Sequence, residues 1–175
     1  MLQGEFDSSL ENLLQDKRFL GYEICELLRK ARNANLVINV DKIIARFAAI
    51  KTVGGISDEM AIDVLRALSL CGVRAQEVEQ KLSVLSDIKN RIHDLSQRKY
   101  VDEEYTKKAI NILLHARNIG LLKTIPQQQL IAILKNCGEY LARPAADVTK
   151  AGGKKEAGEK ISDTNFKSLL EICLY

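Results

Sequence analysis

Apolar residues recur along most of the chain at the spacing of an amphipathic helix, not at the alternating spacing of a strand. Four such runs can be read, each with apolar residues three or four positions apart on one helix face. They contain Leu10, Leu13 and Leu14; Val40, Ile43, Ile44 and Phe47; Val78, Leu82, Leu85, Ile88, Ile92 and Leu95; and, after Pro126, Leu130, Ile131 and Leu134. The chain has only 10 glycines and 2 prolines in 175 residues, too few for a turn-rich sandwich or barrel. The pattern therefore predicts an all-α fold.

Three of the predicted helices end in the same way. The segments that show this, and that can be laid over each other without gaps, are residues 28–36, 65–73 and 113–121. Asn35, Gly72 and Gly120 then fall in register, and asparagine and glycine are the residues that tolerate the left-handed conformation ending many helices. An aliphatic residue follows each of them and can close back on the last turn. This self-similarity indicates internal repeats.

Each repeat combines one of these helices with a second helix, and the average length is near 40 residues. The predicted repeats cover about 21–51, 57–96 and 102–141. We expect a single domain over 1–175, built as a right-handed α-solenoid of about three helical-hairpin repeats with capping helices. The last of these, at 163–175, reads as the first half of a fourth repeat. The Gly- and Lys-containing segment 143–161 predicts a mobile loop, with a Lys-rich tether for an acidic partner as the alternative.

The repeat register also predicts a core column. It consists of one leucine in each first helix and a second small or apolar residue three positions later, one helical turn away. Its members are Leu28, Leu65, Leu113 and Leu170, together with Ala31, Leu68, Ala116 and Cys173.

The overall charge is close to balanced, with 26 basic and 23 acidic residues and a net charge of +3. This excludes a polybasic tail that binds polyanions and gives only weak support to nucleic-acid binding. No run of 18 apolar residues occurs, so membrane insertion is not expected. Residues 1–14 resemble neither a secretory signal nor a transit peptide. A non-organellar protein, an atypical import signal and a processed start all remain open.

The residues that could carry chemistry form no recognisable site. The cysteines, Cys25, Cys71, Cys137 and Cys173, contain no CxxC pair, so we expect buried free thiols and no structural zinc. The two histidines lie on different predicted helices, without a cysteine or carboxylate at ligand spacing, and the two Gly-Gly pairs lack the spacing of a phosphate loop. We expect no catalytic residue, no metal and no cofactor, and so a protein that is not an enzyme.

Basic residues recur at equivalent positions of the repeats. Arg29 aligns with Arg66, and Arg32 aligns with Arg117. Such a column could line one face of a solenoid and bind RNA phosphates or an acidic protein surface. Ordinary solvated helix surface is the alternative. Aromatic residues make up only 5% of the chain and none interleaves with this column, so stacking on single-stranded bases has little support.

The spacing from leucine to Ala or Leu three residues later, and to Gly or Asn seven residues later, resembles the first helix of pentatricopeptide repeats. It is also similar to octotricopeptide and related organellar repeats, over about 21–141 and the half repeat at 163–175. That family reads RNA with a polar residue two positions before the first-helix leucine. The resemblance places this position at Glu26, Asp63 and Asn111. Only Asn111 has the family's residue type, and carboxylates at the other two would repel phosphate.

The resemblance implies a non-catalytic interaction module that docks on the protein subunits of a larger mitochondrial assembly. In size, repeat number and weak charge the chain is similar to the pentatricopeptide-type accessory subunits on the catalytic head of the mitochondrial ATP synthase of euglenozoan protists. The alternative is an RNA-binding protein of organellar RNA processing or translation, with Asn111 and the arginine column in contact with RNA. A cytoplasmic location is the alternative to a mitochondrial one.

Overall fold

The computed structural model describes residues 1–51, 54–79, 84–142 and 163–173, and every regular element within these ranges is helical. The prediction of an all-α fold is confirmed. In chain order the elements are α1 (Gln3–Gln15), α2 (Gly21–Asn33), α3 (Val40–Lys51), α4 (Asp58–Leu70), α5 (Ala75–Glu79), α6 (Val84–Gln97), α7 (Glu103–Asn118), the 3-10 helix η1 (Leu121–Thr124), α8 (Gln127–Leu141) and α10 (Asp163–Cys173).

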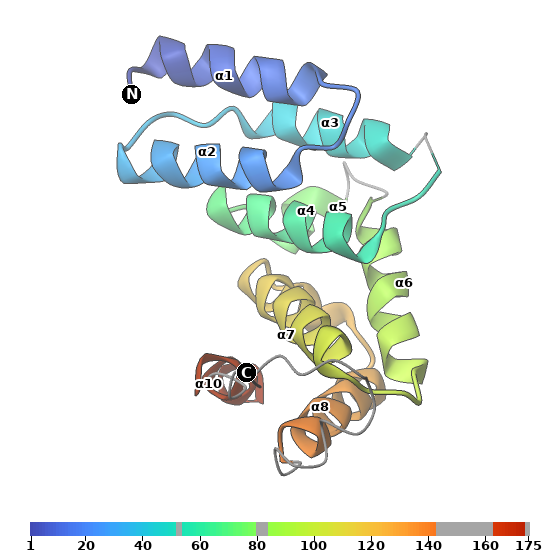
Figure 1. Ribbon diagram of the computed structural model, residues 1–175. Helices are drawn as coiled ribbons and strands as arrows, with labels where there is room; N and C mark the ends of the chain where they lie inside the picture. Colours follow the sequence, from blue (N-terminus) through green and yellow to red (C-terminus); the bar gives the residue numbers. More distant parts are fainter. Residues whose placement is uncertain (52–53, 80–83, 143–162, 174–175) are drawn as a thin grey trace, which may run out of the picture.

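One row of helices runs through the molecule in the order α2, α4, α7 and α10, and each helix packs against the next (Figure 1). A second group accompanies this row. Within it, α1 packs against α3, α3 against α6, and α6 against α8. The two groups meet where α1 packs on α2, where α6 packs on α4 and α7, and where α8 packs on α7 and α10. The core therefore lies between two sets of helices that alternate along the chain.

The core column is buried wherever it crosses α2, α4 and α7. The buried members are Leu28, Ala31, Leu65, Leu68, Leu113 and Ala116. The burial predicted for these six residues is therefore confirmed.

The column prediction is wrong in α10. Leu170 is 49% exposed, whereas Leu169 and Ile172 are buried. Successive residues of a helix point in directions about 100° apart. The buried face of α10 therefore lies one position before the face that the alignment predicts. The side chain of Cys173, the remaining predicted member, lies outside the described residues.

The helix ends follow the sequence prediction. Asn35, Gly72 and Gly120 have φ values of 53°, 70° and 78°, the left-handed conformation that glycine and asparagine tolerate best. At the end of α2 the Leu36 N–H donates to the Ala31 carbonyl at 2.9 Å, and the equivalent bond at the end of α4 is 3.1 Å. These are the backbone bonds of a Schellman motif, which satisfies carbonyls that the helix leaves without partners.

Two helices, α4 and α7, begin with a side-chain cap. Ser57 accepts a hydrogen bond from the Met60 N–H at 3.3 Å, and Asp102 accepts one from the Tyr105 N–H at 2.7 Å. Both side chains act as N-caps, because the first amide groups of a helix have no partner within it. Pro126 directly precedes α8, as its fixed φ favours.

Parts of three predictions fall on residues outside the described ranges. The apolar run from Val78 to Leu95 corresponds to α5 and α6, and residues 80–83 between these helices are not described. The loop expected at 143–161 lies wholly outside the described residues, and the helix expected at 163–175 corresponds to α10 as far as Cys173.

Candidate functional site

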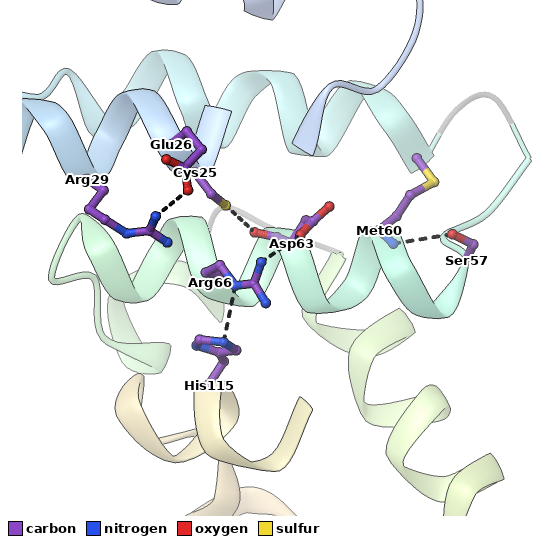
Figure 2. A network of polar contacts seen from close by, with 8 residues as sticks. All are labelled: Cys25, Glu26, Arg29, Ser57, Met60, Asp63, Arg66 and His115. Atoms are coloured by element: carbon purple, nitrogen blue, oxygen red, sulfur yellow. Dashed lines mark hydrogen bonds and ion pairs between the residues drawn. The ribbon is translucent and has the colours of Figure 1, made fainter. Parts of the chain in front are cut away.

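A network of polar contacts joins α2, α4 and α7 on the face where the sequence predicts a binding column (Figure 2). Arg66 lies at its centre. One nitrogen of its guanidinium is 3.6 Å from the Asp63 carboxylate, and its Nε lies 3.5 Å from Nε2 of His115 on α7. The Cys25 thiol on α2 donates to the Asp63 carbonyl oxygen at 3.5 Å. The arginine predicted to face a partner thus also connects two neighbouring helices.

The two arginines predicted on α2 are more exposed. Arg29 forms an ion pair with Glu26 one turn earlier, within the same helix (Figure 2). Arg32 is exposed in the last turn, where a cation interacts favourably with the helix dipole. The structure therefore places these two side chains at the surface, with Arg29 held close to a carboxylate.

The predicted site residues of α7 lie further along the row. Arg117 reaches α10, where its Nη1 donates to the Glu171 carbonyl at 2.8 Å and its Nη2 lies 3.9 Å from the Glu171 carboxylate. Asn111 is half-buried on the same helix. Sequence reasoning did not find Glu171, because 54 positions separate it from Arg117 and no local spacing connects them.

Asp63 is packed against the start of α2. A Cβ atom at Gly21 would lie 2.6 Å from the Asp63 Oδ2 and 2.5 Å from the Phe19 ring, so only glycine fits there. Burial raises the pKa of the Asp63 carboxyl, and the neighbouring Arg66 opposes this shift. The position that the resemblance assigns to base reading is thus enclosed by α2.

His115 lies between α4 and α7 and is kept neutral. Burial, with a smaller contribution from the Arg66 charge, lowers the pKa of its imidazole to about 4. The ring accepts from Arg66 at Nε2, so its proton resides on Nδ1, a buried atom without a hydrogen-bond partner among the described residues. Its backbone carbonyl accepts from the Ser69 hydroxyl of α4 at 3.4 Å. The imidazole and the backbone carbonyl of His115 thus both take part in the contact between α4 and α7.

Three of the four predicted free thiols lie within the described residues, and two of them are buried as predicted. Cys25 and Cys137 are buried and Cys71 is half-buried, and all three are free. Burial raises the pKa of each of these thiols to about 12, so they stay protonated at neutral pH. A protonated thiol is a poor nucleophile and a poor metal ligand.

Within the described residues, no three His, Cys, Asp or Glu side chains come together as a metal site would require. Over the same ranges, none of the helices combines the length and the apolar character needed to cross a bilayer.

Two surface grooves flank α1. The larger, about 470 Å³, runs between α1 and α2, and the smaller, about 420 Å³, runs between α1 and the start of α3. Ser9, Asn12, Leu13, Tyr22, Glu23, Glu26, Leu27 and Lys30 line the first; Gln3, Asp7, Leu10, Glu11, Val37, Asn39 and Lys42 line the second. Glu26 thus borders a groove as well as the arginine column.

Comparison with known proteins gives no relative for this chain. No family model matches it, and neither the curated proteins nor the solved structures contain a match.

Proposed function

We propose that this chain is a non-catalytic interaction module that docks on the protein subunits of a larger assembly. Its architecture in this proposal is a right-handed α-solenoid with three helical-hairpin repeats, at about 21–51, 57–96 and 102–141. The sequential packing of α2, α4, α7 and α10, accompanied by α3, α6 and α8, supports it. The first helices of the three repeats each end with a residue in the left-handed conformation, which supports it further. Stacked hairpins of this kind create extended surfaces suited to binding other macromolecules.

The observation that carries the proposal is the charge of the α2–α4–α7 row. Helix α2 holds two acidic and three basic residues, α4 three and one, and α7 two and three, so the row is neutral. Arg29 pairs with Glu26, Arg66 with Asp63, and Arg117 with Glu171. RNA affinity comes largely from unneutralised cations that displace counterions from phosphates. Three helices without net charge, with the arginines Arg29, Arg66 and Arg117 paired to carboxylates, favour a protein partner over RNA.

An RNA titration distinguishes protein binding from RNA reading. We expect a random pool of single-stranded RNA to bind the wild-type chain more weakly than about 10 µM at 150 mM salt, without sequence preference, as for non-specific contacts. The double variant Glu26→Asn, Asp63→Asn should bind more tightly, because it removes the carboxylates that pair with Arg29 and Arg66. Glu77→Gln with Glu139→Gln, two exposed carboxylates elsewhere, is the matched control.

The opposite result would support the RNA-reading alternative. That alternative requires sub-micromolar, sequence-selective binding by the wild-type chain, and loss of the selectivity in Asn111→Ala. Either observation at physiological salt would overturn the proposed function.

The partner that we propose is a mitochondrial assembly, and the resemblance to pentatricopeptide-type accessory subunits makes the catalytic head of the ATP synthase its specific candidate. A tagged chain should co-purify with the head subunits from solubilised mitochondria, and RNase treatment should leave this unchanged. Loss of the partner after RNase, or a tagged chain found only in the cytoplasmic fraction, would contradict this part of the proposal.

A further inference from the structure

Charge is distributed unevenly along α2, α4 and α7, although the three helices together are neutral. Their first parts and caps hold eight acidic and two basic residues, at 21–26, 57–63 and 102–108. Their last parts, with the loops that follow, hold seven basic residues and a single acidic one, Glu77. We call these last parts the cationic edge, which consists of residues 27–39, 64–77 and 109–126.

The three parts of the cationic edge lie on the same side of the helix row. In Figure 1, α2, α4 and α7 run in the same direction and end on the left. After these helices end, the Ala75 N–H donates to the Ile119 carbonyl at 2.7 Å, which joins the loop behind α4 to the end of α7. Because the cations are neighbours in space, their potentials add and attract an anionic partner.

Two exposed arginines of the cationic edge have no carboxylate beside them. Arg32 lies in the last turn of α2, and Arg74 lies in the loop after α4. One nitrogen of Arg74 donates to the Asn118 carbonyl at 3.2 Å, which holds the guanidinium at the end of α7. Over the described ranges neither arginine forms an ion pair, in contrast to the paired arginines of the row. A carboxylate is the group that a guanidinium binds best, so both can accept one from a partner.

An exposed valine lies at the same edge and is held in place by α1. Val37 follows α2, and its side chain is 76% exposed. Its N–H donates to Oε1 of Gln3, and its carbonyl accepts from Nε2 of the same side chain, both at 3.0 Å. These two bonds fix the backbone while the side chain remains in solvent. A partner that covers Val37 therefore loses little free energy in ordering it.

The composition of the cationic edge suits a peptide better than RNA. Its three segments contain no Phe, Tyr or Trp, the side chains on which the bases of single strands stack. Packed helices lie about 8–10 Å apart, and an extended chain advances about 3.3 Å per residue. A peptide with a carboxylate at every third residue can therefore meet cations on successive helices.

We propose that the cationic edge binds an extended acidic segment of a partner protein. Carboxylates three residues apart pair with Arg32 and Arg74, and an aliphatic side chain of the segment packs on Val37. This inference rests on the proposed function, because it identifies the surface and the partner segment that the interaction module uses.

The probe is a fluorescein-labelled 12-residue peptide with a leucine near its start and a glutamate at every third position after it. One counterpart carries glutamine in place of every glutamate, and another carries the same glutamates in one block. In a polarisation titration at about 50 mM salt, the wild-type chain should bind the spaced peptide about five-fold more tightly than the glutamine peptide and about two-fold more tightly than the block peptide. Equal affinity for the spaced peptide and either counterpart would overturn the proposal.

Variants of the cationic edge should weaken this binding. Arg32→Glu and Arg74→Glu should each cost about five-fold or more in affinity for the spaced peptide. Val37→Ser should cost about two-fold, and this loss should disappear when the leucine of the peptide is also replaced by serine. The controls Lys17→Glu and Lys99→Glu make the same charge change at exposed residues in the loops before α2 and α7, and should stay within about two-fold of wild type. Circular dichroism should show that all five variants remain folded, since each changed side chain is exposed.

A charge swap tests the contact a second time. The double variant Arg32→Glu, Arg74→Glu should prefer a peptide with lysine in place of every glutamate, because the sign of the charge is then reversed on both sides of the contact. If this variant keeps the preference of the wild-type chain, the peptide binds elsewhere and the proposal is wrong. If the two lysine controls weaken binding as much as the edge variants do, the attraction comes from the net charge of the whole chain and the proposal is wrong as well.

A photo-crosslinking experiment separates failure of this inference from failure of the proposed function. Benzoylphenylalanine at position 37, and at position 17 as control, is activated in intact cells, and crosslinked segments are sequenced by mass spectrometry. A protein segment rich in glutamate or aspartate that is captured only from position 37 supports the cationic edge. Protein captured only from position 17 leaves the proposed function in place and rejects the edge. Capture of RNA in place of protein from both positions rejects the two together.

Discussion

Helices α4 and α10 occupy equivalent positions in the predicted repeats, but they are held in different ways. α4 lies between α2 and α7 and also contacts α6, whereas α10 lies at the end of the row against α7 and α8 (Figure 1). Leu65 of α4 is fully buried, and Leu170, its predicted equivalent in α10, is 49% exposed. The alignment therefore predicts the buried leucine correctly for helices with neighbours on two sides. It predicts the wrong leucine for the helix at the end of the row.

The largest expected effect tests this difference directly. Leu65→Asp should unfold the chain, because a carboxylate without a partner in the core costs several kcal/mol, comparable with the 5–15 kcal/mol that stabilises a typical domain. Leu170→Asp should change the free energy of unfolding by less than about 0.5 kcal/mol, as expected for a surface site. Urea unfolding followed by circular dichroism measures both. Similar stability of the two variants would show that the two helices do not differ in burial.

Local patterns predict much of this fold because the relevant interactions are short in sequence. The left-handed ends at Asn35, Gly72 and Gly120 depend on residue type alone, and the caps Ser57 and Asp102 act on amides three residues away. Apolar periodicity identified the helices, and gap-free alignment identified the core register of α2, α4 and α7.

The errors and omissions come from long-range packing. In α10, Leu169 with Ile172 and Leu170 with Cys173 both have i, i+3 spacing, so periodicity alone cannot choose between the two faces; the position of α7 does. For the same reason the sequence did not reveal the contact of Arg117 with Glu171. The α1–α2 groove is another example, since it depends on how two helices pair.

The next largest effect concerns the contact between α4 and α7. His115 has a pKa of about 4 in the folded chain and about 6.5 when unfolded, so between these values only the unfolded chain takes up the proton. Stability should therefore fall as the pH decreases from about 6.5 to 4, by about 2 kcal/mol for this partly exposed ring. Asp63, whose pKa is raised by burial, acts in the opposite direction.

Unfolding free energies measured at pH 7, 6, 5 and 4.5 test whether His115 causes stability to fall with decreasing pH. His115→Gln should flatten the dependence on pH, because glutamine cannot take up the proton. The control, His93→Gln, removes an exposed histidine of α6 without touching the α4–α7 contact. A slope that persists in His115→Gln would show that another group is responsible.

Smaller effects are expected from substituting two glycines, one at the left-handed end of α7 and one in the interior of α8. Gly120 has φ of 78°, which L residues adopt with strain, so Gly120→Ala should destabilise the fold by about 1 kcal/mol. Gly138 lies inside α8 with no atom within 4 Å of an added Cβ, so Gly138→Ala should stabilise by about 0.5–1 kcal/mol. Thermal melts of the two variants should shift in opposite directions. A shift of the same sign in both would contradict the conformations described for these two glycines.

The smallest expected change in the free energy of unfolding comes from weakening the attachment of α10, and it should be confined to that helix. Arg117→Ala removes a hydrogen bond to the Glu171 carbonyl and a partly exposed ion pair, together worth less than about 1 kcal/mol. Among residues 167–172 of α10, the buried side chains are Leu169 and Ile172, so this loss should be concentrated in that helix. Hydrogen exchange should accelerate in residues 163–173 and stay unchanged in α4. Lys135→Ala is the matched control, since its ion pair with Glu139 lies within α8. If exchange in α10 is unaltered by Arg117→Ala, or accelerates equally in α4, then α10 is as firmly held as the middle of the row and the contrast between the two helices does not hold.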